Sequence, residues 1–168
     1  MEEEKLLGLM EATEFRSVTM RGQTARRTVR HYGYDYAYDT ARVERGEPLP
    51  AELVWLWDRA AGLAGLEPDE LAQTLVSRYP PGAPIGWHFD APKFGPSLVG
   101  VSLGAASRLR LRRGDGDGEE RRTFELVLEP RSAYILGGPS RFDWQHSIPP
   151  VKELRYSITF RTLLPPAR

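Results

Sequence analysis

The chain has 168 residues, which is enough for one folded domain with a hydrophobic core and too few for a multidomain machine, so we expect a single domain over residues 1–168. Hydrophobic residues make up 40% and charged residues 27%, which excludes a disordered or fibrous chain, and the 23 basic and 23 acidic residues cancel, so no overall positive field draws the molecule onto nucleic acid or anionic lipid. The absence of cysteine excludes disulfides, thiolate nucleophiles and cysteine-built metal sites, which leaves Asp, Glu and the three histidines, His31, His88 and His146, as candidate metal ligands.

The N-terminal residues Met1–Lys5 are acidic and lead into no apolar stretch long enough for a signal peptide or a membrane span. We therefore expect a soluble, cytoplasmic protein with no membrane partner, acting as a monomer.

Tyrosines alternate at positions 32, 34, 36 and 38, close to Arg26, Arg27 and Arg30. A strand here would align four rings on one face. Such a face, with arginines beside it, suits stacking on nucleic-acid bases, and it equally suits the half-buried face of an edge strand. Both interpretations stay open at this point.

One amphipathic helix is predicted for residues 50–64, because apolar residues recur at three- and four-residue spacings from Leu53 to Leu63, with Pro50 near the start and Gly65 after the end. A short turn follows at residues 67–70. Beyond it, β-rich segments separated by Pro and Gly predict strands at residues 73–79, 85–89, 97–103, 108–113, 123–128, 132–136, 144–148 and 154–163.

This series of short strands indicates a mainly β fold of the α+β class, either a barrel or a two-sheet jelly roll. Residues 114–118, Gly-Asp-Gly-Asp-Gly, are expected to form the tip of a hairpin. A calcium loop is the weaker interpretation, because the rest of its ligand series is missing. The alternating Arg108, Arg110 and Arg112 on the strand before the tip could follow a nucleic-acid backbone, although a solvated hairpin face is the simpler explanation.

A metal site is suggested by His88 and Asp90, whose side chains leave the same face of an extended segment. His-x-Asp alone is common, but His146 supplies a second imidazole on a later predicted strand. Two histidines and one carboxylate can occupy one face of an octahedral metal, an arrangement that holds ferrous iron and leaves open positions for a bidentate co-substrate and dioxygen.

The last predicted strand carries two arginines on one face. Between Arg155 and Arg161, Ser157 and Thr159 point the same way, while Tyr156, Ile158 and Phe160 point the other way. A solvated strand face is one explanation. A strand with such an apolar opposite side more naturally lies inside a sandwich, and buried arginine needs an anionic partner, which a dicarboxylate could supply.

Together, His88-x-Asp90, His146 and Arg155-x-Ser-x-Thr-x-Arg161 resemble the motifs of the AlkB-type branch of the iron- and 2-oxoglutarate-dependent dioxygenases. The resemblance extends from about Leu75 to Leu163. It implies a double-stranded β-helix, a jelly-roll form, with its core at residues 73–163, an N-terminal helix packed on the sheet, and an N-terminal segment at residues 1–45 that carries a substrate lid.

The resemblance also implies roles for individual residues. His88, Asp90 and His146 would be catalytic and bind Fe(II). Tyr79, Tyr134, Arg155, Ser157 and Arg161 would bind 2-oxoglutarate, with Arg155, Tyr134 and Ser157 at its distal carboxylate. Ser77 departs from the family pattern, which has Asn at that position.

The implied reaction uses dioxygen and 2-oxoglutarate to hydroxylate a substrate C–H bond, and an N-methyl group hydroxylated in this way is lost as formaldehyde. The best-known members of the family repair alkylated bases in DNA or RNA, so alkylated single-stranded nucleic acid is the expected partner. Substrate contacts are expected from Arg27, Tyr32, Tyr34 and Trp87.

Against base repair, Pro92 stands where well-studied repair members have a base-contacting Asp. Two alternatives therefore stay open: the same chemistry on a protein side chain or small molecule, and a jelly-roll binding module without turnover.

Overall fold

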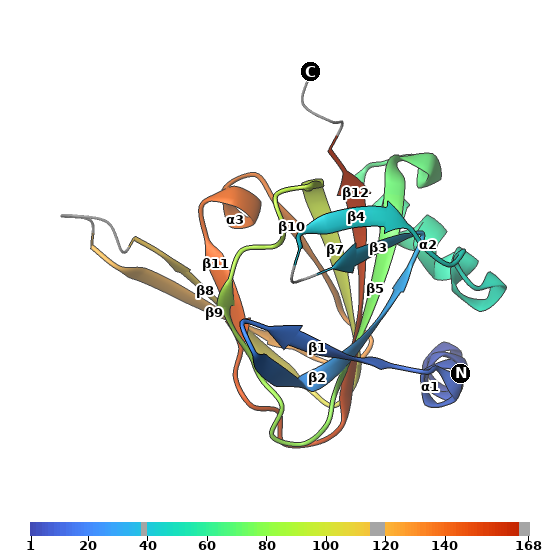
Figure 1. The fold of residues 1–168 in the computed structure, drawn as a ribbon, viewed down its shortest axis with the longest axis horizontal. Helices are drawn as coiled ribbons and strands as arrows, with labels where there is room; N and C mark the ends of the chain where they lie inside the picture. Colours follow the sequence, from blue (N-terminus) through green and yellow to red (C-terminus); the bar gives the residue numbers. More distant parts are fainter. Residues whose placement is uncertain (38–39, 115–119, 165–168) are drawn as a thin grey trace.

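Two antiparallel sheets face each other across the molecule (Figure 1). The computed structural model describes residues 1–37, 40–114 and 120–164. The larger sheet contains, in spatial order, β1 (Arg16–Met20), β2 (Gln23–Tyr32), β5 (Leu71–Tyr79), β12 (Arg155–Leu163), β7 (Phe94–Gly104) and β10 (Ala133–Gly137). The smaller sheet contains β6 (Ile85–His88), β11 (Gln145–Ile148), β8 (Ser107–Arg113) and β9 (Arg122–Leu128). A separate hairpin pairs β3 (Tyr34–Ala37) with β4 (Arg42–Arg45).

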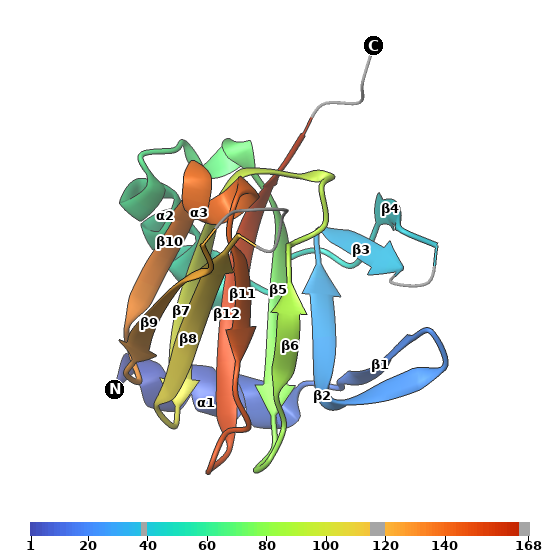
Figure 2. The same cartoon turned by 90° about the vertical axis from the view of Figure 1, so that its left-hand side faces the viewer.

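Two helices cover the outer face of the larger sheet (Figures 1 and 2). They are α1 (Glu2–Ala12) and α2 (Ala51–Ala64). Helix α2 ends at Gly65, which has φ 68°, and the backbone N–H of Leu66 then donates to the carbonyl of Ala61 at 2.9 Å. Two shorter helical segments, η1 (Pro68–Glu70) and α3 (Pro139–Phe142), lie in connections between strands. No helix in the described ranges is long and apolar enough to cross a membrane.

Strand β12 shows why the larger sheet needs this helical layer. Tyr156, Ile158 and Phe160 are at most 3% exposed and belong to the outer core, together with Leu53 of α2 and Leu6 of α1. Because successive residues of a strand point to opposite faces, the alternate residues of β12 must face the smaller sheet. The outer face is thus apolar, and the polar face is turned toward the space between the sheets.

A second, smaller core joins the inner faces of the two sheets. Its buried residues come from both sheets and from the loops at their closed end: Tyr79, Ala83, Leu98, Leu109, Leu111, Leu128, Leu136, Ile148 and Val151. Five of these residues, Tyr79, Leu98, Leu109, Leu136 and Ile148, also line the cavity between the sheets.

The fold confirms the expected jelly roll, and a strand occurs at each of the eight predicted positions, with ends shifted by up to three residues. Helix α2 and the turn at η1 are also confirmed. An N-terminal helix packed on the sheet was implied by the resemblance and is confirmed, but the bounds of α1 and the strands β1, β2 and β4 were not predicted. The apolar patterns of these segments are short, and in the strands they are interrupted by charged residues.

The expectation of one strand aligning four tyrosines is wrong. Gly33 interrupts it with φ 83°, and a Cβ at this position would lie 2.3 Å from the carbonyl oxygen of Ala72, so only glycine fits there. As a result, Tyr32 ends β2 inside the outer core, whereas Tyr34 begins the separate β3–β4 hairpin. Tyr38 and nearly all of the predicted tip at 114–118 fall outside the described residues, although β8 and β9 do pair as a hairpin.

Candidate active site

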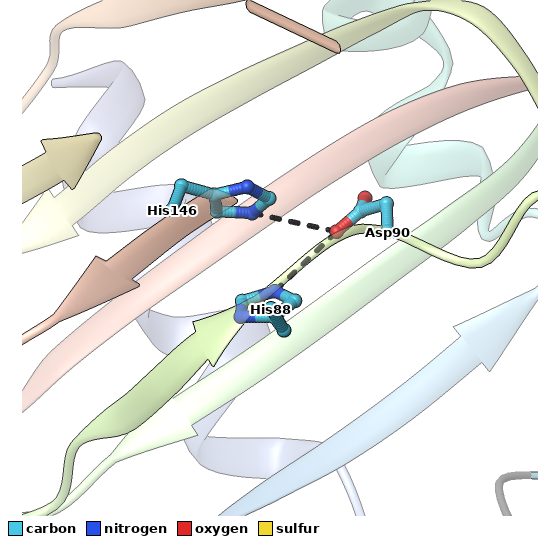
Figure 3. A group of neighbouring side chains, drawn as sticks. All are labelled: His88, Asp90 and His146. Carbon is cyan, nitrogen blue, oxygen red and sulfur yellow. Dashed lines mark ion pairs between the residues drawn. The ribbon is translucent and has the colours of Figure 1, made fainter. Parts of the chain in front are cut away.

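Three predicted metal ligands meet on the inner face of the smaller sheet (Figure 3). His88 ends β6, and His146 lies directly opposite it on β11, with the ring centroids 4.2 Å apart. Asp90 follows β6, and its Oδ1 lies 3.5 Å from Nε2 of His88 and 3.4 Å from Nε2 of His146. All three ligand atoms lie within 4.8 Å of one another, so a single ion can be bound by all of them.

The donor chemistry of this cluster fits Fe(II). Nδ1 of His88 lies 2.8 Å from the carbonyl oxygen of Gly86, a contact that keeps the proton on Nδ1 and leaves Nε2 as the lone-pair donor. Burial lowers the pKa of His146, which also favours the neutral, ligating imidazole. Burial alone would raise the pKa of Asp90, but contacts with His146, His88 and Arg161 hold it well below its ordinary value. The cluster therefore presents two imidazole nitrogens and one ionised carboxylate.

The inner face of the larger sheet carries a polar track opposite this cluster. In the register of the sheet, Ser157 of β12 lies between Ser77 of β5 and Ser102 of β7. On one side of this row Arg155 lies opposite Tyr79, and on the other side Arg161 lies opposite Gln73. Both predicted arginines therefore lie inside the sandwich, which rules out the solvated-face explanation.

Arg155 is a buried cation that needs an anion. It is 0% exposed, its Nε donates to Oγ of Ser102 at 3.2 Å, and its guanidinium stacks on the ring of Tyr79 at 5.2 Å. Within the described residues, neither Nη1 nor Nη2 has a hydrogen-bond partner. Because an unpaired guanidinium is costly to bury, this geometry indicates a binding position for a ligand carboxylate.

Tyr134 lies near Arg155 in the same part of the site. It lies opposite Gly100 across the β10–β7 pair, and a Cβ on Gly100 would come within 2.3 Å of the tyrosine ring. Glycine thus makes room for the ring to lie flat on the sheet. Burial raises the pKa of Tyr134 to about 12, so its hydroxyl stays a neutral donor at physiological pH.

Arg161 forms hydrogen bonds both to a residue of the polar track and to the candidate metal ligand Asp90. Its Nε donates to Oε1 of Gln73 at 2.7 Å, and its Nη1 donates to Oδ2 of Asp90 at 3.4 Å. The guanidinium lies 3.9 Å from the ring centroid of Phe94. The second oxygen of Asp90 is thereby held while Oδ1 faces the histidines.

A cavity of about 530 Å³ is lined by the three candidate metal ligands and by most of the other predicted site residues. Of the other predicted residues, those that line it are Tyr79, Tyr134, Ser157, Arg161, Arg27 and Trp87. Arg155 lies beside Tyr79, just outside the lining. Tyr32 and Tyr34 do not line the cavity: Tyr32 is in the outer core, and Tyr34 contacts Arg45 at 6.0 Å.

The residues that sequence reasoning missed come from strands β1 and β3 and from one short helix. Tyr36 of β3 reaches the cavity and packs edge-on against Phe94, with the ring centroids 5.8 Å apart, while Met20 of β1 lines the cavity beside it. Asp35 ties β3 to β1, because Nη2 of Arg16 donates to both of its carboxylate oxygens, at 3.0 and 2.8 Å. The alternating tyrosines were the sequence pattern that pointed to an aromatic residue at the cavity, and among the described tyrosines of that pattern Tyr36 is the one that lines it.

His31, the third histidine, lies on β2, with its Nδ1 3.1 Å from Oδ1 of Asp35. Burial, aided by Arg161, lowers the pKa of His31 from 6.5 to about 4. The unfolded chain therefore binds more protons between those pH values, and the free energy of unfolding should fall as the pH drops from about 6.5 to 4, by up to about 3 kcal/mol for this group. Urea titrations in the presence of a chelator should show a shallower pH dependence for His31→Gln, and an unchanged slope would contradict this assignment.

Arg141 of α3 fixes the loop that follows Asp90. It is 4% exposed and donates to four backbone carbonyls, those of Gly95 at 3.2 Å, Asp90 at 3.4 Å, Ala91 at 3.0 Å and Phe94 at 2.8 Å. No sequence pattern predicted this, because the acceptors are backbone atoms that only the folded loop brings together.

Arg141→Met should therefore lower the free energy of unfolding by about 2–4 kcal/mol, because it leaves buried carbonyls without donors. It should also weaken Fe(II) binding by about 10- to 100-fold, since the loop orients a metal ligand. Chemical denaturation and anaerobic metal titration measure the two effects. Arg113→Met is the matched control, because that side chain is 48% exposed. Equal effects in both variants would contradict the role given to Arg141.

A family model described as the 2OG-Fe(II) oxygenase superfamily matches residues 5–161. The chain belongs to this superfamily. Among relatives of this 2OG-Fe(II) oxygenase, the alpha-ketoglutarate-dependent dioxygenase AlkB of Salmonella typhimurium is 32% identical over 151 residues, covering 80% of this chain and 65% of that protein. The tRNA (carboxymethyluridine(34)-5-O)-methyltransferase alkbh8 of Xenopus tropicalis is 30% identical over 152 residues, covering 86% of this chain and 23% of that protein. The chain thus spans only part of the length of these relatives.

The solved structure of OsALKBH1 shares the fold of this 2OG-Fe(II) oxygenase, with a TM-score of 0.71 at 16% identity over 96% of this chain and 89% of that chain. The relatives named AlkB place the chain in the AlkB-type branch of the superfamily, as the sequence motifs predicted. Fe(II) and 2-oxoglutarate give the superfamily its name, and the ligand cluster and the buried arginines fit both.

Proposed function

We propose that this chain is an Fe(II)- and 2-oxoglutarate-dependent dioxygenase that removes alkyl groups oxidatively from bases of single-stranded DNA or RNA. The proposal rests on the position of His88, Asp90 and His146, whose ligand atoms lie within 4.8 Å of one another at the cavity. The larger sheet, on the other side of this space, carries buried arginines that can bind the carboxylates of a ligand. A binding module without turnover would not need both features.

His88, Asp90 and His146 hold the iron. Arg155 would bind the distal carboxylate of 2-oxoglutarate through Nη1 and Nη2, which have no hydrogen-bond partner among the described residues, and Tyr134 and Ser157 would add hydroxyl donors there. When bound, iron and co-substrate supply an oxidant able to hydroxylate a C–H bond, with 2-oxoglutarate converted to succinate and carbon dioxide.

The remaining contacts orient the co-substrate and the metal. Arg161 keeps the ligand carboxylate of Asp90 in place and lies where the near end of the co-substrate is expected, with Tyr79 beside the track. Ser77, in the position where the family has Asn, still presents a hydroxyl to the cavity. The apolar and aromatic parts of the lining limit water around the oxidant.

A nucleic-acid substrate is supported by the names of two relatives, a tRNA methyltransferase and an alkylated DNA repair protein, and by the lining of the cavity. The lining includes Arg27 and Tyr36 from residues 1–45, and it includes Trp87, whose ring centroid lies 5.1 and 4.5 Å from the guanidinium groups of Arg110 and Arg112. Aromatic rings beside arginines suit a base with its flanking phosphates.

The test is formaldehyde release from N-methylated single-stranded oligonucleotides. With Fe(II), 2-oxoglutarate and dioxygen, formaldehyde should form in step with succinate and well above the 2-oxoglutarate turnover seen with unmethylated strands. Failure on DNA and RNA alike, with succinate still formed, would move the substrate to a protein or a small molecule.

A further inference from the structure

One buried side chain lies between the support of the metal site and the β3–β4 hairpin. Gln73 of β5 is 0% exposed, and both ends of its amide form hydrogen bonds. Its Oε1 accepts from Nε of Arg161 at 2.7 Å, and its Nε2 donates to the backbone carbonyl of Tyr34 at 2.7 Å. Because a guanidinium can only donate, the amide oxygen faces Arg161 and the amide nitrogen faces β3.

The first of these contacts fixes the direction of the Arg161 guanidinium. While Nε is held by Gln73, Nη1 lies 3.4 Å from Oδ2 of the candidate metal ligand Asp90. Arg161 is only 4% exposed, so bulk water cannot readily replace the amide oxygen as the acceptor for Nε. Without that acceptor the guanidinium is free to turn, and the second oxygen of Asp90 loses a fixed donor.

The second contact attaches the hairpin to the larger sheet. The hairpin is a two-stranded sheet of its own, which Figure 2 shows beside the larger sheet. Such a ribbon is marginally stable in isolation, so contacts from outside must hold it. The ion pair between Arg16 and Asp35 is exposed and contributes little, whereas the hydrogen bond from Gln73 comes from a fully buried side chain.

The hairpin and Arg161 also meet through aromatic rings. The guanidinium of Arg161 lies 3.9 Å from the ring centroid of Phe94, and Tyr36 packs edge-on against the other side of this contact, 5.8 Å from Phe94. Tyr36, Arg161 and Asp90 all line the cavity. A shift of the hairpin therefore moves a part of the cavity wall, and a shift of Arg161 changes the support of a metal ligand.

We infer that Gln73 is a positioning residue for the reaction of this site, an inference that rests on the proposed function for what that reaction is. Its amide oxygen holds Arg161 against Asp90, and its amide nitrogen holds the hairpin that brings Tyr36 to the cavity. Gln73 itself does not line the cavity, so it acts through these neighbours.

Two substitutions separate the two roles. Gln73→Glu keeps an acceptor for Arg161 but has no donor for the carbonyl of Tyr34, because the adjacent guanidinium keeps a carboxyl group ionised. Gln73→Leu, of similar size, removes both contacts. Gln23→Leu is the matched control, because Gln23 is exposed at the start of β2.

Trypsin cleavage of the metal-free protein after Arg42 and Arg45 measures opening of the hairpin, with the cut sites identified by mass spectrometry. Cleavage after Arg131, in the turn before β10, measures general opening of the chain. Relative to that turn, both Gln73 variants should be cut in the hairpin about tenfold faster than the wild-type protein, because loss of a buried hydrogen bond favours local opening. An unchanged ratio in Gln73→Glu overturns the inference.

Anaerobic titration with Fe(II) measures the other role. Gln73→Leu should weaken Fe(II) binding by about 10- to 100-fold, whereas Gln73→Glu should stay near the wild-type affinity. A side chain that merely supports the fold would not give this split, because both readouts would then follow the free energy of unfolding, which urea titration measures. Wild-type Fe(II) affinity in Gln73→Leu, or equal losses in both variants, contradicts the inference. These readouts need no turnover, so a wild-type protein that releases no formaldehyde would contradict the proposed function alone.

Discussion

Replacing Asp90 by asparagine is expected to abolish the metal centre. The variant keeps the side-chain shape but loses the negative charge shared by His88, His146 and Arg161. Fe(II) affinity should fall by more than about 100-fold, beyond the loss typical when a residue that merely supports a ligand is changed. Anaerobic protein with Fe(II) and 2-oxoglutarate should show the weak visible charge-transfer band of the chelate, and the variant should not.

Asp143→Asn is the matched control, because it makes the same change at a side chain that is 46% exposed and lies just before β11. It should keep the band at full strength. A band that persists in Asp90→Asn, or that is missing from the wild-type protein as well, would contradict the ligand assignment. His88→Ala should behave like Asp90→Asn.

Arg155→Met is expected to separate co-substrate binding from both metal binding and stability. Loss of two charge-assisted hydrogen bonds should weaken 2-oxoglutarate binding by about 100-fold or more, while Fe(II) still binds to His88, Asp90 and His146. In the absence of 2-oxoglutarate the variant should be the more stable protein, by about 1–4 kcal/mol, because an unpaired buried charge is replaced by an apolar chain of similar length.

Isothermal titration with 2-oxoglutarate and chemical denaturation without it measure these two effects. Arg108→Met, at a guanidinium that is 64% exposed and paired with Glu125, is the control and should change neither by much. If Arg155→Met lost Fe(II) and 2-oxoglutarate equally, or unfolded more easily than the wild-type protein, the role given to Arg155 would be wrong.

The parts of the site that could be predicted from sequence are those that follow strand periodicity. His88 and Asp90, and the series from Arg155 to Arg161, are regular alternations whose faces follow from a period of two residues. The same rule placed the predicted strands of the jelly roll. Helix α1 also had signals in the sequence, because Leu6 and Met10 stand one turn apart and the glutamates of the first turn favour a helix start.

The rest depends on contacts that exist only in the folded chain. Arg141 acts through backbone carbonyls, and any loop residue offers the same acceptor in the sequence. Tyr36 differs from Tyr32 because the chain bends at Gly33, where its backbone lies close to the carbonyl of Ala72 on the partner strand. A tyrosine pattern alone cannot distinguish a ring in the core from one at the cavity.

The two faces of the larger sheet have different roles, because one packs against the helices and the other faces the cavity. Along β12, Tyr156, Ile158 and Phe160 join the core beneath the helices, while the intervening residues carry the chemistry. A change on the inner face therefore leaves the main apolar core untouched, and a change in that core leaves the cavity lining untouched. Substitutions among the cavity residues of the larger sheet can thus alter the substrate space while the core beneath the helices keeps its packing.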